Sequence, residues 1–468
     1  MVPLADGGMM SPMANPMAQT DRIDPRLIWA IAIPAMLTNV ATALIGLGDM
    51  WIVGRLEDAA LQGAVEIGAR LFALLFTVMN FLKTGTTGLV AQDGSRAGVE
   101  AQAETLARGI AIGLVIAGTL LLLKPLLLPA LLSALGADGD VAAAARVYAD
   151  IRYWSAPGVM VNLALIGFLI GRRQVRTALI IEVIYNLTNV GLGLLFVLQF
   201  DLGIAGIGWS SVVAEYGKLA GAGLVVLAGV GGPGLRRSFV DRASFRWAQL
   251  RPFLAVNRDI FLRTVVLMLA LAVLTRLGAE RGPVVLAANG IIYQLFIFSA
   301  LLIDGFENAA QVINGERYGA RDRRGFLVAT RMILWRGLLV GAALSGVYAL
   351  VGGPVIDSFA ATQAVAAQAR SDLWWLVAMP LAGAASYVFD GVFVGASWTR
   401  AMLVSMAGAT IVYGLSLWLT WPYGNDGLWF SFVLFLAVRA VLQLMLIPGL
   451  ARRTMPDEIS KTDSETVR

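Results

Sequence analysis

The sequence contains no cysteine and no histidine among its 468 residues. Without cysteine, the chain has no disulfide, no thiol nucleophile and no thiolate metal site. Without histidine, a His-ligated catalytic metal is excluded, and any proton carried through the protein has to travel on Asp, Glu or Tyr. We therefore expect no metal site, no cofactor and no enzyme active site built on these groups.

Charged residues are scarce as well, at 14% of the chain, where a soluble domain carries roughly 25%. Hydrophobic residues make up 58%, and the mean hydropathy is +0.74. This composition predicts an integral membrane protein with many spans, in contact with membrane lipids. The net charge of +5 does not indicate a nucleic-acid partner, because arginines in loops that face anionic lipid and the cytoplasm account for it.

Apolar runs of helical length recur along the chain, and a helix that crosses a bilayer needs about 20 apolar residues. Twelve such runs predict an all-α polytopic membrane protein. The fourth and the tenth run are long, and we expect both to extend beyond the bilayer. The predicted spans are residues 27–52, 61–83, 105–130, 142–170, 177–200, 204–230, 253–278, 285–312, 328–352, 366–397, 402–421 and 427–450.

The loops alternate in charge, which predicts the orientation of the spans. By the positive-inside rule, the arginine-rich loops and both termini face the cytoplasm, and we expect a plasma (inner) membrane protein. The arginine-rich set holds Arg22, Arg26, Arg96, Arg172, Arg173, Arg176, Arg236, Arg237, Arg242, Arg246, Arg251, Arg317, Arg321, Arg323, Arg324, Arg452 and Arg453. The alternate set holds Arg55, Arg276 and Arg281, with Glu57, Asp58, Asp138, Asp140, Asp201 and Asp357.

An internal repeat with a spacing of about 224 residues divides the chain in two. Ala64 recurs as Ala288, and Pro157 in SAPGVMVNLALIGFLIG recurs as Pro380 in AMPLAGAASYVFDGVFVGA. Because an even number of helices precedes the repeat, both copies insert with the same topology, as two pseudosymmetric six-helix lobes. The predicted organisation is a disordered cytoplasmic tail at 1–25, an N-lobe at 26–230, a cytoplasmic linker at 231–252, a C-lobe at 253–451 and a cytoplasmic tail at 452–468.

The first span, Leu27 to Gly54, carries a single ionisable side chain, Asp49. A carboxylate deep in a membrane helix costs about 2.5–3.5 kcal/mol on insertion scales, so it faces a cavity or a partner by default. Pro34 lies inside the same helix, where it removes a backbone hydrogen bond and bends the helix. Two interpretations of Asp49 stay open: a carboxylate wetted by headgroup water, and an ion- or proton-binding group on a bendable helix.

Other polar groups are predicted to lie within the membrane. In the first lobe, Glu215 is followed by Lys218 three residues on, which we interpret as a locally neutralised pair. Asn186 and Asn189 share a helical face, either as contacts between helices or as hydrogen-bond partners of a carboxylate.

The second lobe has its own candidates. If Arg263 lies within the membrane, it needs an acid partner, and Asp304 and Glu307 are the candidates. Asp390 lies in a long apolar run and has no basic residue nearby in the sequence, so it is the second candidate coupling carboxylate after Asp49.

Several motifs together resemble the multidrug and toxic compound extrusion (MATE) transporters, and most closely their DinF branch. The motifs are IPAMLTNVATALIGLGDMWIVGRL, KTGTTGLVAQ, SAPGVMVNLALIGFLIGRRQ, NRDIFLRT, IDGFENAAQVINGERYGARD and YVFDGVFVGA. They lie in the family's order and extend over residues 25 to 453. The resemblance implies a twelve-helix antiporter with two lobes that exchanges protons or sodium for cationic or amphipathic drugs or toxins.

The resemblance also implies roles for individual residues. Pro34 matches the proline at which the family's first helix bends, and Asp49 matches its proton-binding aspartate. Tyr148, Asn189 and Ser211 resemble the hydrogen-bonding residues around that aspartate.

The chain departs from the family pattern at one position. Many relatives carry a second aspartate in the fifth helix, four residues after the asparagine, where this chain has Gly193. Sodium-coupled relatives use an acidic network in the C-lobe, whose tenth-helix aspartate matches Asp390. The absence of this second aspartate favours coupling to protons through Asp49 over coupling to sodium. We expect the protein to be a monomer.

Two other functional classes fit the sequence less well. A lipid-linked oligosaccharide flippase of related architecture needs basic residues in its central cavity to hold a pyrophosphate, whereas the clearest intramembrane charges here are acidic. A membrane enzyme without His or Cys needs an all-carboxylate site, and no paired DxxD or ExxE motif lies on any predicted span.

Overall fold

The computed structural model describes residues 24–54, 59–135, 139–230, 237–360 and 362–456. Within these ranges, only the backbone is described for residues 42–54, 59–63, 66, 140, 230, 242 and 243. All regular structure in the described part of the chain is helical. The predicted tail at 1–25 therefore lies almost wholly outside the described residues.

The helices occur in two successive groups, which we call the N-lobe and the C-lobe. The N-lobe consists of α1 (Pro25–Gly54), α2 (Ala59–Met79), α3 (Phe81–Arg96), α4 (Gly98–Ala134), α5 (Gly139–Arg152), α6 (Ala156–Gly171), α7 (Val175–Leu194) and α8 (Gly203–Val230). The C-lobe consists of α10 (Trp247–Ala279), α11 (Pro283–Gly319), α12 (Arg323–Phe359), α13 (Gln363–Ser371), α14 (Leu373–Gly395), α15 (Thr399–Thr420) and α16 (Gly424–Thr454).

These helices correspond to the twelve predicted spans. Ten described stretches are long and apolar enough to cross a membrane, and one of them, Thr399–Thr454, contains both α15 and α16. α1 supplies the remaining span. The second, fourth and tenth predicted spans are each built from two helices (α2 with α3, α5 with α6, and α13 with α14). In the fourth span, the break is a short 3-10 turn at Tyr153–Ser155, directly before Pro157 in the first turn of α6, a position that proline tolerates.

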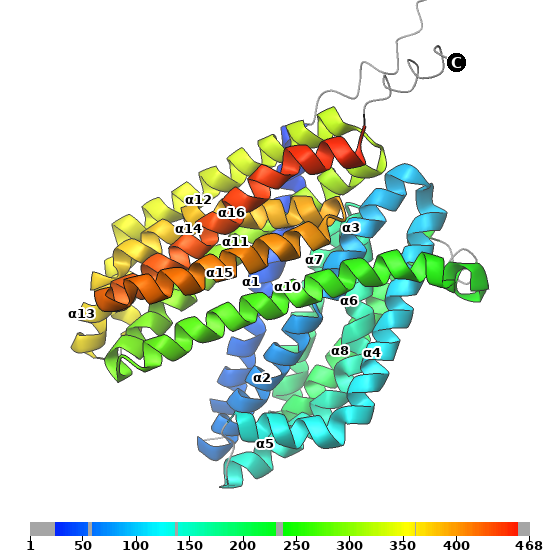
Figure 1. Cartoon of the computed structure of the whole chain (residues 1–468). Helices are drawn as coiled ribbons and strands as arrows, with labels where there is room; N and C mark the ends of the chain where they lie inside the picture. Colours follow the sequence, from blue (N-terminus) through cyan, green and yellow to red (C-terminus); the bar gives the residue numbers. More distant parts are fainter. Residues whose placement is uncertain (1–23, 55–58, 136–138, 231–236, 361, 457–468) are drawn as a thin grey trace, which may run out of the picture.

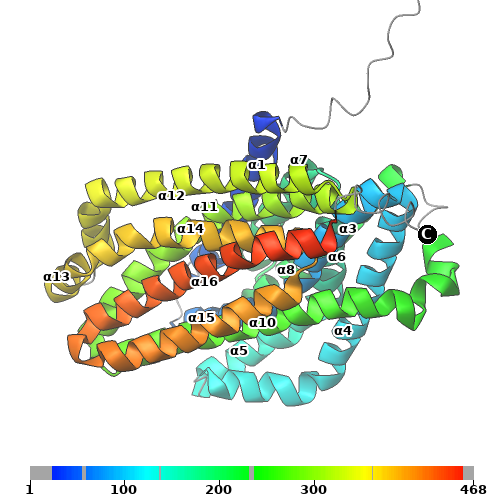
Figure 2. The ribbon, with the colours of Figure 1, turned by 45° about the horizontal axis from the view of Figure 1, so that its top comes forward.

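The two lobes are joined by a shared core near one end of the molecule. α1 and α3 pack against α11, and α3 also contacts α10 and α14. A cluster of fully buried side chains there takes members from both lobes, among them Ile31, Phe168, Phe306 and Phe393. Away from this core the two groups of helices diverge, as Figures 1 and 2 show, and each lobe has an apolar cluster of its own.

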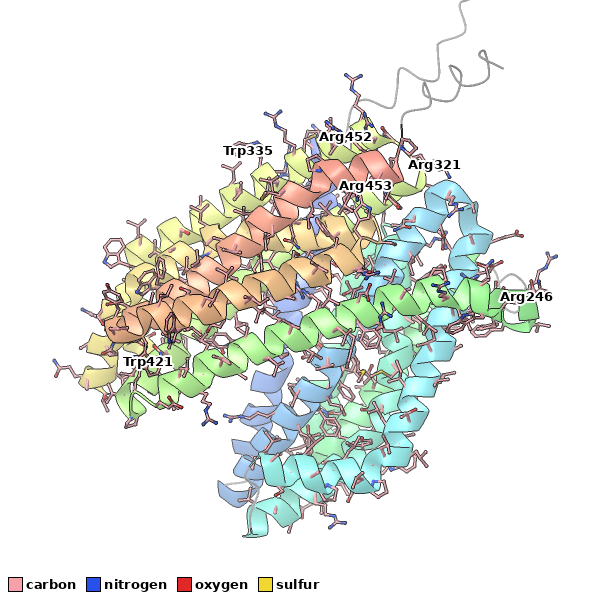
Figure 3. The ribbon with its side chains drawn as sticks, in the orientation of Figure 1. Arg246, Arg321, Trp335, Trp421, Arg452 and Arg453 are labelled. Carbon is pink, nitrogen blue, oxygen red and sulfur yellow. The ribbon has the colours of Figure 1, made fainter. Side chains whose placement is uncertain are left out.

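Arginines mark the end of the molecule at which the lobes meet. Figure 3 shows Arg321, Arg452 and Arg453 near the described C-terminal end of the chain, and Trp421 at the opposite end of the C-lobe. At that opposite end, the guanidinium of Arg281 lies over the Trp421 ring, 4.8 Å from its centroid. Arginine-rich loops on one side of the membrane, with Trp and Tyr rings at the membrane–water interfaces, are typical of membrane proteins.

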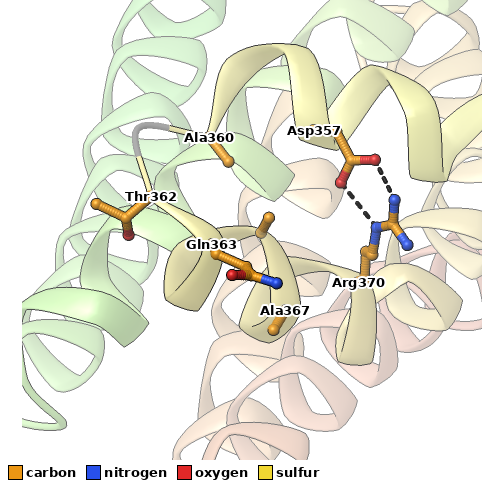
Figure 4. A pocket seen from close by; sticks show the side chains of 7 residues that line it. Asp357, Ala360, Thr362, Gln363, Ala367 and Arg370 are labelled. Atoms are coloured by element: carbon orange, nitrogen blue, oxygen red, sulfur yellow. Dashed lines mark hydrogen bonds and ion pairs between the residues drawn. The ribbon is translucent and has the colours of Figure 1, made fainter.

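A pocket of about 420 Å³ lies between α12 and α13 (Figure 4). Its lining includes the ion pair between Arg370 and Asp357. Because it is formed within the C-lobe, away from the contact between the lobes, we do not place the transport site there.

Candidate functional site

The first group of predicted site residues lies in the N-lobe. Asn189 of α7 donates a hydrogen bond to the hydroxyl of Ser211 of α8 at 3.2 Å, and both side chains are buried. α7 packs directly against α1, the helix that carries Asp49. The side chain of Asp49 lies outside the described residues, so its contact with this pair stays a prediction.

Tyr148 lies on α5 and is fully buried. Its hydroxyl accepts a hydrogen bond from Arg152, and its ring packs edge-on against Phe72. Gly68 of α2 faces the same ring at a distance that leaves no room for a Cβ atom. Tyr148 is therefore held in place by the contact of its ring with α2 and by the hydrogen bond from Arg152, one turn later on α5.

A second set of buried polar residues in the N-lobe differs from the predicted pairing of Lys218 with Glu215. Lys218 forms an ion pair with Glu182 of α7 at 2.6 Å, not with Glu215. Glu215 instead accepts a hydrogen bond of 2.7 Å from Asn162 of α6. The prediction of a local pair was wrong because residues three apart on α8 face different neighbouring helices, and buried charges take partners across the helix contact.

α1 connects the two lobes through its first half. It runs unbroken from Pro25 to Gly54 with Pro34 inside it, and the Pro34 carbonyl accepts a hydrogen bond from the Thr38 hydroxyl at 2.8 Å. Asn39 donates to the Leu301 carbonyl of α11 at 3.1 Å, and Trp29 packs edge-on against Phe306. A change in the direction of α1 would consequently alter its packing against helices of both lobes.

The C-lobe contains a buried ionic site centred on Asp390 of α14. Its carboxylate is paired with Arg263 of α10 and with Arg439 of α16, the latter at 2.6 Å. Gln443 donates a third hydrogen bond to it at 2.7 Å. Asp390 has no basic residue nearby in the sequence, but in the structure two arginines from other helices lie beside it. Arg263 does lie within its span, and its partner is Asp390, not Asp304 or Glu307.

Three further charged groups lie within electrostatic range of this site. Asp304 and Glu307 of α11 interact with Arg263 and with Lys83 of α3. Glu307 accepts a hydrogen bond from Gln311 at 2.9 Å, whereas Asp304 has one buried carboxylate oxygen without a hydrogen-bond partner among the described residues. With every group ionised, three cations (Lys83, Arg263, Arg439) balance three anions (Asp304, Glu307, Asp390).

Two of the basic residues in this cluster were missed by the sequence analysis. Arg439 interrupts the apolar run FSFVLFLAVRAVLQLML, and Lys83 lies at the end of a predicted span. A charge within a predicted span was the available signal in both cases. The premise that intramembrane charges here are mainly acidic was therefore wrong. The balance of charge, however, leaves no excess of cations to hold a pyrophosphate.

The chain resembles known proteins over nearly its whole length. The family model MatE matches residues 34–195 and 260–419. DNA damage-inducible protein F of Escherichia coli is 33% identical over 422 residues, which cover 89% of this chain and 90% of that protein. Probable multidrug resistance protein NorM of Chromobacterium violaceum is 24% identical over 464 residues, which cover 92% of this chain and 95% of that protein.

A solved structure matches the fold. It is described as the outward-facing conformation of a multidrug resistance MATE family transporter of the MOP superfamily. It aligns with a TM-score of 0.79 and 17% identity, over 94% of this chain and 99% of that chain. This match confirms the predicted all-α, twelve-helix fold.

Proposed function

The chain belongs to the MatE family of multidrug efflux transporters, and on that premise we propose that it exports cationic or amphipathic small molecules in exchange for protons. The family consists of transporters, so the chain is a multi-pass membrane transporter and not an enzyme. We further propose that it lies in the plasma (inner) membrane as a monomer, with both termini in the cytoplasm. The positive-inside rule applied to its arginine-rich loops supports this orientation.

The observation that carries the choice of proton over sodium is the state of Asp390. A sodium ion bound there would have to approach a carboxylate that already holds two guanidinium groups, and like charges at such distances repel strongly in a buried site. The two arginines thus occupy the place that a coupling cation would need. This arrangement supports coupling through the N-lobe, where Asp49 lies on the helix that joins the lobes.

In the proposed cycle, Asp49 takes up a proton from the outside and loses its charge. The neutral acid binds a cationic drug less well and exchanges hydrogen bonds with the Asn189–Ser211 pair and with Tyr148. α1 then bends at Pro34, and the drug leaves. A ligand shifts such an equilibrium only by its different affinities for the two states, so the pKa of Asp49 has to differ between them.

The function is tested by dye efflux in inverted vesicles that contain the purified protein. We expect efflux of a cationic dye under an imposed proton gradient and none under a sodium gradient of the same size at uniform pH. Vesicles that contain the Asp49→Asn variant are the control for leakage. Efflux driven by sodium alone would contradict the proposed coupling, and no efflux of cationic or amphipathic dyes under either gradient would contradict the proposed substrate class.

Pro34→Ala is expected to slow efflux while drug binding is retained and thermal stability rises. The proline leaves the backbone carbonyl one turn earlier without its helical donor, and alanine restores that hydrogen bond. The substitution should favour the straight helix by about 3 kcal/mol, the helix-interior penalty of proline, which reduces a bent state of comparable energy to below about 1%. The measurement compares drug binding to purified protein with efflux from vesicles. Efflux at the parent rate would mean that Pro34 is a packing residue and the hinge lies elsewhere.

A further inference from the structure

Two polar contacts connect the lobes at their arginine-rich end. In one, Arg173, in the turn after α6, binds Glu316 near the end of α11 through two parallel hydrogen bonds, one of them 2.6 Å from Nε to Oε1. In the other, Gln92 near the end of α3 donates to the Gly395 carbonyl at 2.6 Å and to the Ser397 hydroxyl at 2.7 Å. Each contact joins a helix of one lobe to the turn that follows a buried helix of the other.

The two contacts are copies of each other. Glu316 lies 224 residues after Gln92, and Ser397 lies 224 residues after Arg173, the same spacing as the sequence repeat. The backbones agree as well, because Arg173 and Ser397 both adopt left-handed conformations, with φ of 62° and 55°. Non-glycine residues adopt this conformation uncommonly. The internal symmetry thus places one contact on each side of a central axis, one of them charged and the other neutral.

Between the two contacts, the backbones of α3 and α11 lie very close together. A Cβ atom on Gly315 would lie 2.9 Å from Cβ of Ala91 and 3.3 Å from the carbonyl oxygen of Gly88. A Cβ atom on Gly319 would collide with the carbonyl oxygen of Gln92. This close approach requires glycine, and it brings the polar side chains on either side within reach of the opposite lobe.

We propose that these two contacts form a symmetric cytoplasmic gate, which is closed in this structure and opens when the transporter turns inward. The proposal rests on the proposed function only in that the protein alternates between two openings. Transport of a drug from the cytoplasm requires the lobes to part at this end, so each transport cycle breaks and remakes both contacts. The energy of the two contacts is therefore part of the difference between the outward- and inward-facing states.

The charged contact is solvent-accessible, which limits its strength. The side chains of Arg173 and Glu316 are 46% and 23% exposed, and both line a pocket of about 290 Å³ at the rim of the gate. An exposed ion pair contributes little to the stability of the state that contains it. A gate of this kind therefore favours contact between the lobes without preventing their separation.

The absence of cysteine provides a direct test. A single Ala91→Cys substitution places the only thiol of the protein on α3 beside Gly315, in the closed seam. Its rate of labelling by a membrane-impermeant maleimide, applied to the cytoplasmic side of inverted vesicles, reports how often the gate opens. Glu316→Gln in this background should raise the labelling rate by about two- to five-fold, the range expected for an exposed ion pair, and Gln92→Ala should act in the same direction.

Two variants separate a gating role from simple damage. The exchange Arg173→Glu with Glu316→Arg rebuilds the pair with its charges reversed and should return labelling toward the rate of the reporter protein. Gln92→Glu with Ser397→Arg converts the neutral contact into a second charged one and should lower labelling. Glu280→Gln, which removes the exposed i,i+4 pair with Arg276 at the other end of the C-lobe, is the matched control and should leave labelling unchanged.

The proposed gate is contradicted if Glu316→Gln leaves the labelling rate of the Ala91→Cys protein unchanged. It is also contradicted if the exchange of Arg173→Glu with Glu316→Arg gives the same labelling rate as Glu316→Gln alone. The assay contains no drug and no ion gradient. A failure of proton-coupled efflux would therefore leave this result intact, and a failure of the gate would leave the efflux assay intact.

Discussion

Asp49→Asn is expected to abolish efflux while the protein still folds and inserts. Asparagine has almost the same shape as aspartate but does not titrate, so the proposed exchange of a proton for a cation has no carrier. Removal of a charge from a membrane helix does not destabilise insertion, because the charge itself is costly there. Efflux should fall to the level of protein-free vesicles, with an unchanged gel-filtration profile and unfolding temperature.

Proton release on drug binding gives a second measurement for this variant. In lightly buffered detergent solution, the parent should release a proton when a cationic drug binds, and Asp49→Asn should not. Asp201→Asn is the matched control, because Asp201 is exposed in the α7–α8 connection with φ of 51°, a left-handed conformation that asparagine also tolerates. If Asp49→Asn exports at the parent rate, the proton carrier is another group, and the buried Glu182 and Glu215 are the next to examine.

Asp390→Asn is expected to destabilise the folded protein strongly and to reduce the transport activity of the folded fraction only partly. The substitution leaves Arg439, which is 1% exposed, and Arg263 beside each other without the carboxylate that they share. Breaking a buried ion pair by removing one partner costs about 3–5 kcal/mol. We expect a clearly lower unfolding temperature in detergent and reduced protein yield, with the surviving protein still driven by the proton gradient.

A second substitution tests whether the loss comes from uncompensated charge. Asp390→Asn combined with Arg439→Gln removes one anion and one cation, so the combined variant should be more stable than Asp390→Asn alone. Such coupling is expected for residues in direct contact. A fully stable Asp390→Asn protein that has lost sodium-dependent efflux would show instead that Asp390 is the coupling site.

The spans were predictable because long apolar runs depend only on local composition. The breaks within spans were not, since a run such as 61–83 reads as continuous although the structure divides it between α2 and α3 around Asn80. α3 also extends to Arg96, beyond the predicted end, because polar residues such as Gln92 and Asp93 are satisfied by contacts with other helices.

Charge partners were the least predictable part of the site. Spacing along one helix suggested Lys218 with Glu215, but the partner comes from α7, and the two arginines of Asp390 are 127 and 49 residues away in sequence. Where a pair is both local and exposed, as with Arg276 and Glu280, the i,i+4 rule holds. A charged side chain that is buried in the membrane needs a partner of opposite charge, but the sequence does not indicate which helix supplies that partner.

The balanced charges around Asp390 bear on how the membrane voltage acts on the transporter. Moving one elementary charge across 100 mV involves about 2.3 kcal/mol, so a lobe with a net buried charge would be pulled toward one of its two positions. Lys83 lies in the N-lobe, whereas Arg263, Arg439, Asp304, Glu307 and Asp390 lie in the C-lobe. With every group ionised, the cluster is neutral as a whole, but its C-lobe part carries one net negative charge. The step between the two openings is therefore expected to depend on voltage. Over a complete cycle the protein returns to its starting state, so the net charge moved is that of the drug and the proton, and a singly charged drug exchanged for one proton would produce no net current.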